Sequence, residues 1–310
     1  MKEHPLVRRI LRGCMAIMLG VLIAWGCAAP AAQEGRILRN LTRDYYVSAF
    51  SPSWSPDGTQ IAFTSGEQYS DPAILDVASG DVRTLCADGF DDVVVNGRAW
   101  VGDTIAFSSD REGSDDIWTV STESTDWTRV TPGPAREWGA SWYPGGKRIL
   151  FQSDRSGAFN LWSVNADGTH LEQLTEGDFE DGDACVSPDG RTIVFKSNRS
   201  GNWDIWLRHE DGTLTNLTND PYEDHNPSWS PDGRYVVFDS NRADTDGTLW
   251  ALEVAGGELT QLTANLGYDG APSWSPDGRW LAFESDRDNQ MDIWLLELPP
   301  ELIAAPATPE

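Results

Sequence analysis

Six pairs of neighbouring aromatic and acidic residues recur along the chain at similar intervals. Large aromatic side chains commonly anchor protein–protein contacts, and carboxylates attract cations or basic surfaces. A repeated set of this kind could bind a basic protein or a cation. The pairs are Asp44 with Tyr45, Phe90 with Asp91, Glu137 with Trp138, Phe179 with Glu180, Tyr222 with Glu223, and Tyr268 with Asp269.

The alternative for these pairs is structural. Five arginines follow at matching intervals, so the acids could form ion pairs with them while the aromatic rings fill space between repeated units. The arginines are Arg111, Arg155, Arg199, Arg242 and Arg287. Both interpretations stay open at the level of sequence.

Catalytic motifs are missing from the sequence. It contains no G-x-S-x-G, no H-E-x-x-H, no glycine-rich phosphate loop and no C-x-x-C. The string most like a calcium loop, residues 244–247, has Arg242 where the first ligand would stand, and Asp and Gly are ordinary turn residues. These observations favour a binding protein over an enzyme without deciding the question. No cofactor is predicted, although Ca²⁺ at an acidic channel mouth is an alternative.

One phrase recurs six times and sets the position of these residues. Its clearest copy runs from Trp229 through Ser-Pro-Asp to Gly233, and Pro and Gly there predict a tight turn between two short strands. A second tryptophan marks the third strand of each copy from the second onward. Repeats of this length with four strands are typical of β-propeller blades. The anchor positions, 42 to 46 residues apart, are Trp54, Trp100, Trp142, Cys185, Trp229 and Trp274.

The two ends of the repeat array predict how the ring closes. After Leu298 the chain turns to Pro299-Pro300 without a fourth strand for the sixth copy, whereas residues 37–42, before the first anchor, match residues 213–218. We therefore expect an all-β, six-bladed propeller over residues 36–298, with the strand at 36–42 completing the last blade. Residues 299–310 are expected to form a disordered Ala/Pro tail.

Strand direction alternates within a blade, and this assigns the aromatic–acid pairs to one face. Loops from fourth to first strands and from second to third strands emerge together; we call this the loop face, and the opposite side with its tight turns the turn face. The pairs and the arginines are all expected on the loop face, around the mouth of the central channel. Some features of this face occur in one copy only, so repetition does not explain them. They are Trp138, Trp203, His225 and the long loop from Asp91 to Arg98.

The repeat phrase also points to a family. Ser-Pro-Asp-Gly stands at 55–58, 187–190, 230–233 and 275–278, and residues 283–287 and 292–294 continue the pattern. In these features the chain resembles TolB-like six-bladed propellers. The resemblance spans residues 36–298 and covers the propeller alone, without the α/β domain that precedes it in TolB. It implies the fold, but fold likeness does not give function.

The first 27 residues read as an export signal. Lys2, Arg8, Arg9 and Arg12 precede an apolar run from Met15 to Trp25 that is too short to span a membrane. The following Gly26-Cys27 resembles a lipoprotein cleavage site, so Cys27 is the expected lipidated residue and residues 28–35 a linker. Ordinary cleavage near Ala31 is the alternative. The predicted location is periplasmic or otherwise extracytoplasmic, with the membrane reached only through a lipid anchor.

Charge and cysteine content narrow the partner. From residue 28 onward 19 basic and 48 acidic residues give a net charge of −29, which would repel nucleic acid and anionic headgroups. Solubility alone could also explain this charge. Cys86 and Cys185 are expected on opposite sides of the ring, too far apart for a disulfide. We therefore expect a monomeric scaffold of the cell envelope that binds a protein partner. The negative charge favours a partner with a basic surface. A propeller lyase or hydrolase with a metal-assisted channel site, or a cation or sugar sensor, are the alternatives.

Overall fold

Each Ser-Pro-Asp-Gly phrase folds as a tight turn organised by its aspartate. The computed structural model describes residues 36–303, apart from 67–68, 87–88, 96, 125, 244–246 and 265–266. In the fifth copy Asp232 Oδ1 accepts hydrogen bonds from Ser230 Oγ at 2.7 Å and from the Arg234 N–H at 3.1 Å. Gly233 has a φ of 73°, which favours glycine. These turns connect the first and second strands of the blades.

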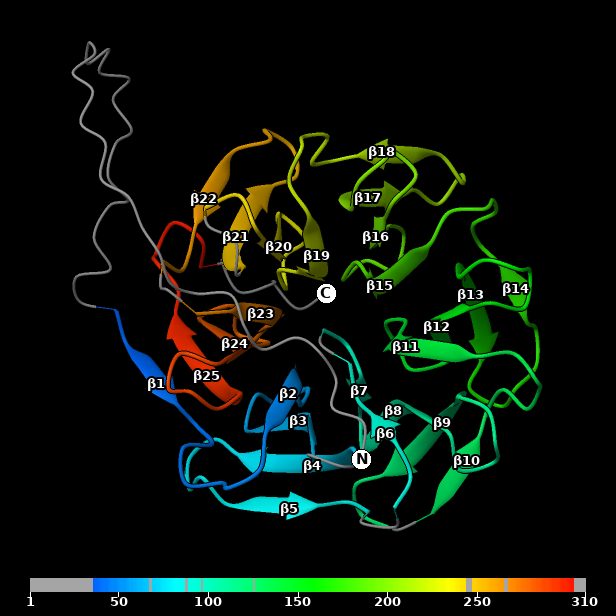
Figure 1. Cartoon of the computed structure of the whole chain (residues 1–310), viewed down its shortest axis with the longest axis horizontal. Coiled ribbons are helices and arrows are strands. Elements are labelled where there is room, and N and C mark those ends of the chain that lie inside the picture. Colours follow the sequence, from blue (N-terminus) through cyan, green and yellow to red (C-terminus); the bar gives the residue numbers. More distant parts are fainter. Residues whose placement is uncertain are drawn as a thin grey trace, which may run out of the picture. The chain divides into compact units, whose positions relative to one another are not determined.

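Six antiparallel sheets are arranged as the blades of a ring (Figure 1). Blade one contains β2 (Ala49–Trp54), β3 (Gln60–Ser65), β4 (Asp71–Asp76) and β5 (Val82–Thr84). Blade two contains β6 (Asp92–Val93), β7 (Trp100–Val101), β8 (Thr104–Ser109), β9 (Asp116–Ser121) and β10 (Trp127–Arg129). Blade three contains β11 (Glu137–Trp142), β12 (Arg148–Ser153), β13 (Asn160–Asn165) and β14 (Glu172–Gln173).

The remaining blades repeat this order. Blade four contains β15 (Asp181–Val186), β16 (Ile193–Ser197), β17 (Asp204–Arg208) and β18 (Leu214–Asn216). Blade five contains β19 (Asp224–Trp229), β20 (Tyr235–Ser240), β21 (Thr248–Glu253) and β22 (Leu259–Gln261). Blade six contains β23 (Asp269–Trp274), β24 (Trp280–Ser285), β25 (Asp292–Glu297) and β1 (Leu38–Asn40).

The N-terminal strand closes the ring as predicted. β1 pairs antiparallel with β25, with Leu38 opposite Leu296 and Asn40 opposite Trp294. Beyond the strand, Thr42 Oγ1 donates to Asp292 Oδ1 at 2.8 Å and accepts the N–H of Ile293 at 2.9 Å. The last blade therefore consists of strands from both ends of the propeller sequence, and its outer edge is paired.

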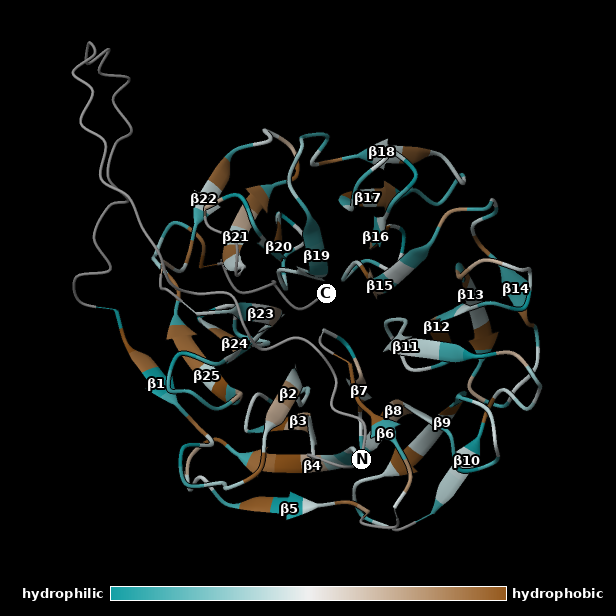
Figure 2. Cartoon of the chain, viewed as in Figure 1, coloured by the Kyte–Doolittle hydropathy of each residue, from teal (hydrophilic) through white to brown (hydrophobic). Residues whose placement is uncertain are grey.

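The core lies between neighbouring blades. Six phenylalanines occupy one equivalent position in the second strands and are fully buried: Phe63, Phe107, Phe151, Phe195, Phe238 and Phe283. Figure 2 shows apolar residues concentrated in strands such as β4, β17 and β25, whereas the inner strands β15 and β19 are more hydrophilic. Since no helix is present in the described residues, none there could span a membrane.

One anchor position differs from the sequence prediction. In blade four Val186 pairs with Ile193 as Trp229 pairs with Val236, so Val186, and not Cys185, takes the anchor position. Cys185 instead corresponds to Ser228, one residue earlier. The spacing between anchors varies by several residues, so it fits Cys185 as well as Val186. Only the register of strand pairing distinguishes the two. Cys86 and Cys185 do not form a disulfide with each other; Cys185 is buried and Cys86 partly exposed.

The expected disorder does not begin at residue 299. Residues 299–303 form a turn in which the N–H of Leu302 donates to the carbonyl of Pro299 at 2.9 Å. Leu302 is 3% exposed and packs with Trp274 and Leu298 because its aliphatic side chain fills space between blades five and six. The predicted signal peptide, the Cys27 lipidation site, the linker and residues 304–310 lie outside the described residues.

Candidate functional site: the loop face and its channel

The five loop-face arginines belong to the scaffold. Each guanidinium binds a buried carboxylate at the start of its blade's inner strand, at 2.5 to 2.8 Å in four blades. Each also lies 4.8 to 5.4 Å from the ring centroid of the third-strand tryptophan. The structural interpretation therefore holds for these arginines. The pairs are Arg111 with Asp92, Arg155 with Glu137, Arg199 with Asp181, Arg242 with Asp224, and Arg287 with Asp269.

The six predicted acids are not equivalent in the structure. Glu137 and Asp269 are the buried partners of arginines, being 1% and 0% exposed. Glu223 is half-buried, and its Oε2 accepts the N–H of Trp203 at 3.1 Å. The exposed ones are Asp44, Asp91 and Glu180. The six acids therefore do not form one uniform set, because the acid falls at different positions relative to the start of the inner strand.

Four of the six predicted aromatic residues point outward on the loop face. Phe90, Phe179 and Tyr222 are equivalent: each precedes the arginine-binding acid of its blade by two residues, and each lies 5.6 to 5.8 Å from that arginine. Trp138 stacks on Phe159 with ring centroids 5.4 Å apart. All four retain 39 to 43% exposure, which leaves a large part of each ring available for contact.

The other two predicted aromatic residues turn inward. Tyr45 packs edge-on against Phe63 at 5.9 Å, and its hydroxyl lies 3.2 Å from Ser65 Oγ. Tyr268 reaches over Gly270 toward Glu284: a Cβ built on Gly270 would lie 1.9 Å from the tyrosine oxygen. Glycine at 270 is therefore required for this orientation of Tyr268.

Five inner strands carry a β-bulge. The register shifts at the same place in β2, β11, β15, β19 and β23. A bulge leaves one residue out of the ladder and re-aims its side chain, which is common near functional sites. The bulged residues have positive φ of 47 to 74°: Ser51, Gly139, Asp183, Asn226 and Ala271.

Second-strand side chains cap the backbone of these bulges. Asp239 accepts the N–H of Ala271 at 3.3 Å, and Glu284 accepts the N–H of Ser51 at 2.7 Å. Asp239 also accepts from Asn226 Nδ2 at 2.9 Å. The two carboxyl groups are 4% and 9% exposed and lack an arginine partner among the described ion pairs. They form, with Tyr268, a buried acidic group beside the inner strands of blades six and one.

Burial changes the protonation of this group. It raises the pKa of Asp239 to about 7, and the charge of Glu284 acts in the same direction, against the hydrogen bonds from Asn226 and Ala271. Burial likewise raises the pKa of Glu284, while hydrogen bonds from Ser51 and Tyr268 oppose the rise. A carboxylate that is buried away from water is stabilised by a proton or by another cation. Asp239 and Glu284 therefore have the chemistry to bind an ammonium or guanidinium group.

His225 and Trp203 lie together beside Lys196. Their rings are 5.9 Å apart, and Lys196 Nζ lies 5.0 Å from the Trp203 centroid. Lys196 also pairs with the bulged Asp183 at 2.6 Å. Burial lowers the pKa of His225, as does the nearby lysine charge, so this imidazole is neutral at pH 7. The structure thus brings together the copy-specific residues His225 and Trp203.

The long loop of blade two enters the channel from the side. Gly97 accepts a hydrogen bond on its carbonyl from Ser53 Oγ at 3.0 Å, and a Cβ at Gly97 would lie 3.4 Å from Cys185 Sγ. The carbonyl of Arg98 accepts the N–H of Trp142 at 2.8 Å. The loop therefore contacts blades one, three and four, and it splits the inner strand of blade two into β6 and β7.

The sequence analysis did not predict the buried acids Asp239 and Glu284, although the repeat contains a signal for them. In every second strand one residue separates the buried phenylalanine from a serine, and this residue varies while its neighbours do not. The six residues are Thr64, Ser108, Gln152, Lys196, Asp239 and Glu284. Within the described part of the chain no three His, Cys, Asp or Glu side chains are grouped so as to hold a metal ion.

Comparison with known proteins agrees with this architecture. The family model described as the TolB beta propeller domain matches residues 31–256. No curated protein matches the chain. The chain is similar to TolB from Acinetobacter baumannii, with 23% identity, a TM-score of 0.64, and coverage of 74% of this chain and 57% of that one. It thus spans little more than half the length of that protein.

Two further solved structures show the same fold. A putative TolB from Agrobacterium tumefaciens has 23% identity and a TM-score of 0.65, with coverage of 84% of this chain and 97% of that chain. An oligogalacturonate lyase from Vibrio parahaemolyticus has 12% identity and a TM-score of 0.58, with coverage of 88% and 96%. Similar propellers thus occur in enzymes as well, and at these identities only the fold is shared. Because the family model matches well over half of the sequence, the chain belongs to the TolB beta propeller domain family.

Proposed function

We propose that this protein is an exported, lipid-anchored module of the bacterial cell envelope that binds a protein partner through its loop face. The distribution of exposed aromatic rings carries the proposal. In the described residues six aromatic side chains are at least 39% exposed, and all lie on this face, five in its loops and Trp138 at the start of the inner strand β11. They are Tyr46, Tyr69, Phe90, Trp138, Phe179 and Tyr222. Exposed aromatic anchors gathered on one face are characteristic of protein-binding surfaces.

The charge of the chain supports a basic partner. Because the five loop-face arginines are neutralised by buried acids, exposed acids such as Asp44, Asp91 and Glu180 dominate the field around the aromatic rings. Such a surface speeds association with a basic protein and opposes anionic ones. The partner is therefore a basic protein surface, with no nucleic acid and no direct lipid contact.

The binding experiment compares matched exposed residues on and off the loop face. The purified propeller captures partners from envelope extract, alongside Trp138→Ala and Phe179→Ala. Leu259→Ala is the control, since Leu259 is 38% exposed but lies on an outer strand. We expect the two loop-face variants to lose the partner and the control to retain it. Equal capture by all forms would refute the proposal.

Export and anchoring rest on the leader sequence and are tested separately. Cys27→Ala should move the protein from the membrane fraction to the soluble fraction and abolish lipid labelling. A protein that stays membrane-bound and labelled would contradict anchoring at Cys27 while leaving the binding proposal untouched.

A cation-binding sensor is the second candidate, and the buried acids Asp239 and Glu284 favour it. In that case Ca²⁺ should raise the melting temperature of the wild type and not that of Asp239→Asn. Repeating the capture experiment with a chelator separates the two functions. A partner that is still captured without Ca²⁺ supports direct protein binding, whereas a partner lost with the chelator supports the cation sensor.

A further inference from the structure

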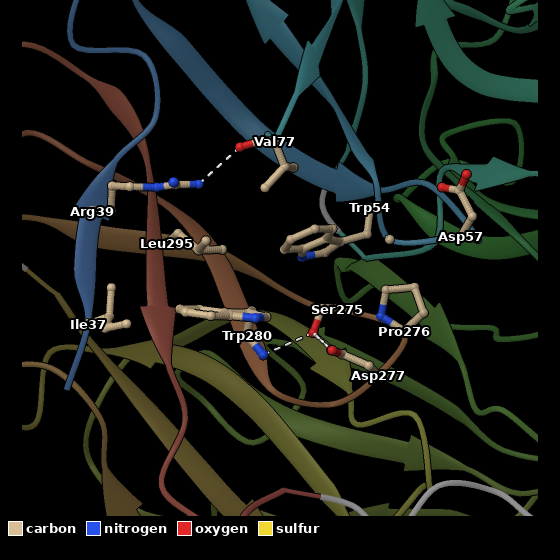
Figure 3. Close-up of a pocket in the computed structure, with 11 residues that line it drawn as sticks. Ile37, Arg39, Trp54, Asp57, Val77, Ser275, Pro276, Asp277, Trp280 and Leu295 are labelled. Atoms are coloured by element: carbon tan, nitrogen blue, oxygen red, sulfur yellow. Dashed lines mark hydrogen bonds between the residues drawn. The ribbon is translucent and has the colours of Figure 1, made fainter. Parts of the chain in front are cut away.

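A cavity of about 560 Å³ opens between blades six and one toward the turn face. Trp54 of β2 and Trp280 of β24 lie on opposite sides of it, with Leu295 of β25 between them (Figure 3). Val77 lies beside Trp54, and Arg39 of β1 closes one end by donating to the Val77 carbonyl at 3.1 Å. Its volume falls in the range of ligand pockets. The loop-face function makes no use of this groove.

The equivalent groove between blades five and six is filled by the protein itself. Leu302, from the turn after Pro299-Pro300, packs there with Ala251, Trp274 and Leu298, and Tyr235 packs against the same cluster. The Tyr235 hydroxyl lies 3.5 Å from the carbonyl of Glu301. A short proline-containing segment therefore seats one leucine between two blades.

The two grooves correspond residue by residue. Each lining residue occupies the same place in its blade, as the strand registers and the backbone bond after each third strand show. Trp280 takes the place of Tyr235, Leu295 that of Ala251, Trp54 that of Trp274, and Val77 that of Leu298. At these four positions both grooves carry apolar or aromatic side chains, so this part of the open groove offers the same chemistry as the filled one.

We propose that the groove between blades six and one is a second protein-binding site, which takes a leucine or isoleucine side chain from a proline-containing segment of a partner protein. The adjacent groove supplies the model for the occupant: a leucine two residues after a Pro-Pro pair. In the filled groove the residue before the leucine is Glu301. In the open groove Arg39 occupies the position that Thr260 has in the filled one. The added guanidinium favours an acidic residue next to the aliphatic one.

The probe is a fluorescently labelled peptide with the sequence of residues 299–303, Pro-Pro-Glu-Leu-Ile, titrated against the full chain and followed by anisotropy. We expect saturable binding that is lost when the peptide's leucine is replaced by aspartate. Val77→Trp should fill the groove and weaken binding by at least about tenfold, because one buried aliphatic side chain contributes that much or more.

Two matched variants separate this site from other surfaces. Val254 has the position of Val77 in the groove between blades four and five, which is lined by the polar Thr192 and His209. Val254→Trp and the loop-face variant Trp138→Ala should therefore bind the peptide as the wild type does. Trp280→Ala provides a second change in the groove itself, and it should also weaken binding.

A final variant tests the equivalence of the two grooves. Leu302→Ala empties the groove between blades five and six, so a chain that remains folded by circular dichroism should bind two peptides where the wild type binds one. The proposal is overturned by wild-type protein that does not bind the peptide, by equal binding of the aspartate peptide, or by equal binding to Val77→Trp. A stoichiometry that stays at one in folded Leu302→Ala would also overturn it.

Discussion

The carboxyl group of Asp239, which is 4% exposed, lies 2.9 Å from the side-chain nitrogen of Asn226 and has no arginine among its described ion-pair partners. Asn226 is the bulged residue of its inner strand, so a backbone irregularity and a buried acid stabilise one another. Removing either side chain would take one hydrogen bond from the other in a site that water barely reaches.

The first prediction concerns the pH dependence of stability. The pKa of Asp239 is about 7 in the folded protein and near 3.8 when the chain is unfolded, so the native state binds more protons between these values. The free energy of unfolding should therefore fall as pH rises from about 4 to 7, by at most roughly 4 kcal/mol from this group, and level off above.

Urea unfolding at several pH values measures this effect. Asp239→Asn keeps a hydrogen-bonding side chain of the same size and should flatten the decline. Asp211→Asn is the control, because hydrogen bonds from Thr213 hold the pKa of this exposed aspartate below its ordinary value. An unchanged slope in Asp239→Asn would show that other groups cause the decline.

The second prediction concerns the closure of the ring. Thr42→Val keeps the shape of the side chain but removes the hydroxyl that joins Asp292 and the N–H of Ile293. Two buried polar groups then lose a partner, so we expect a loss of about 1–3 kcal/mol in urea unfolding. Thr128→Val, on the exposed outer strand of blade two, should change stability little. Equal stability of both variants would contradict a role for Thr42 in closure.

The third prediction concerns the buried ion pairs. Arg199→Met leaves the Asp181 carboxylate, 1% exposed, without its cation, and should cost about 3–5 kcal/mol. Arg191 is exposed in a turn of the same blade, and Arg191→Met should be nearly neutral. A melting temperature of Arg199→Met close to that of the wild type would indicate that the pair does not stabilise the blade.

The fourth prediction concerns the C-terminal segment. A chain that ends at residue 303 should be as stable as the full chain, whereas one that ends at 298 loses the Leu302 side chain and should be about 2–5 kcal/mol less stable. Thermal unfolding of the two truncations decides this, and identical midpoints would mean that Leu302 contributes no packing energy.

Repetition explains why the fold could be predicted. Four copies carry the same Ser-Pro-Asp-Gly turn, all six carry a phenylalanine at a similar interval in the second strand, and residues 37–42 match the one strand that the sixth copy lacks. These are local patterns, and six consistent copies leave little choice of architecture. The arginine pairs were foreseen as an alternative for the same reason.

The candidate sites depend on contacts between copies, which periodicity does not specify. Sequence spacing placed Cys185 one residue out of register and treated Glu137 and Glu223 as equivalent, because only strand pairing fixes which side of the sheet a residue faces. Asp239 has a raised pKa only because folding buries it, and its burial cannot be deduced from the sequence. The sequence by itself determined the six blades and their closure. The tertiary structure alone decided which polar groups are buried and which groove Leu302 fills, since burial and packing depend on residues far apart in the chain.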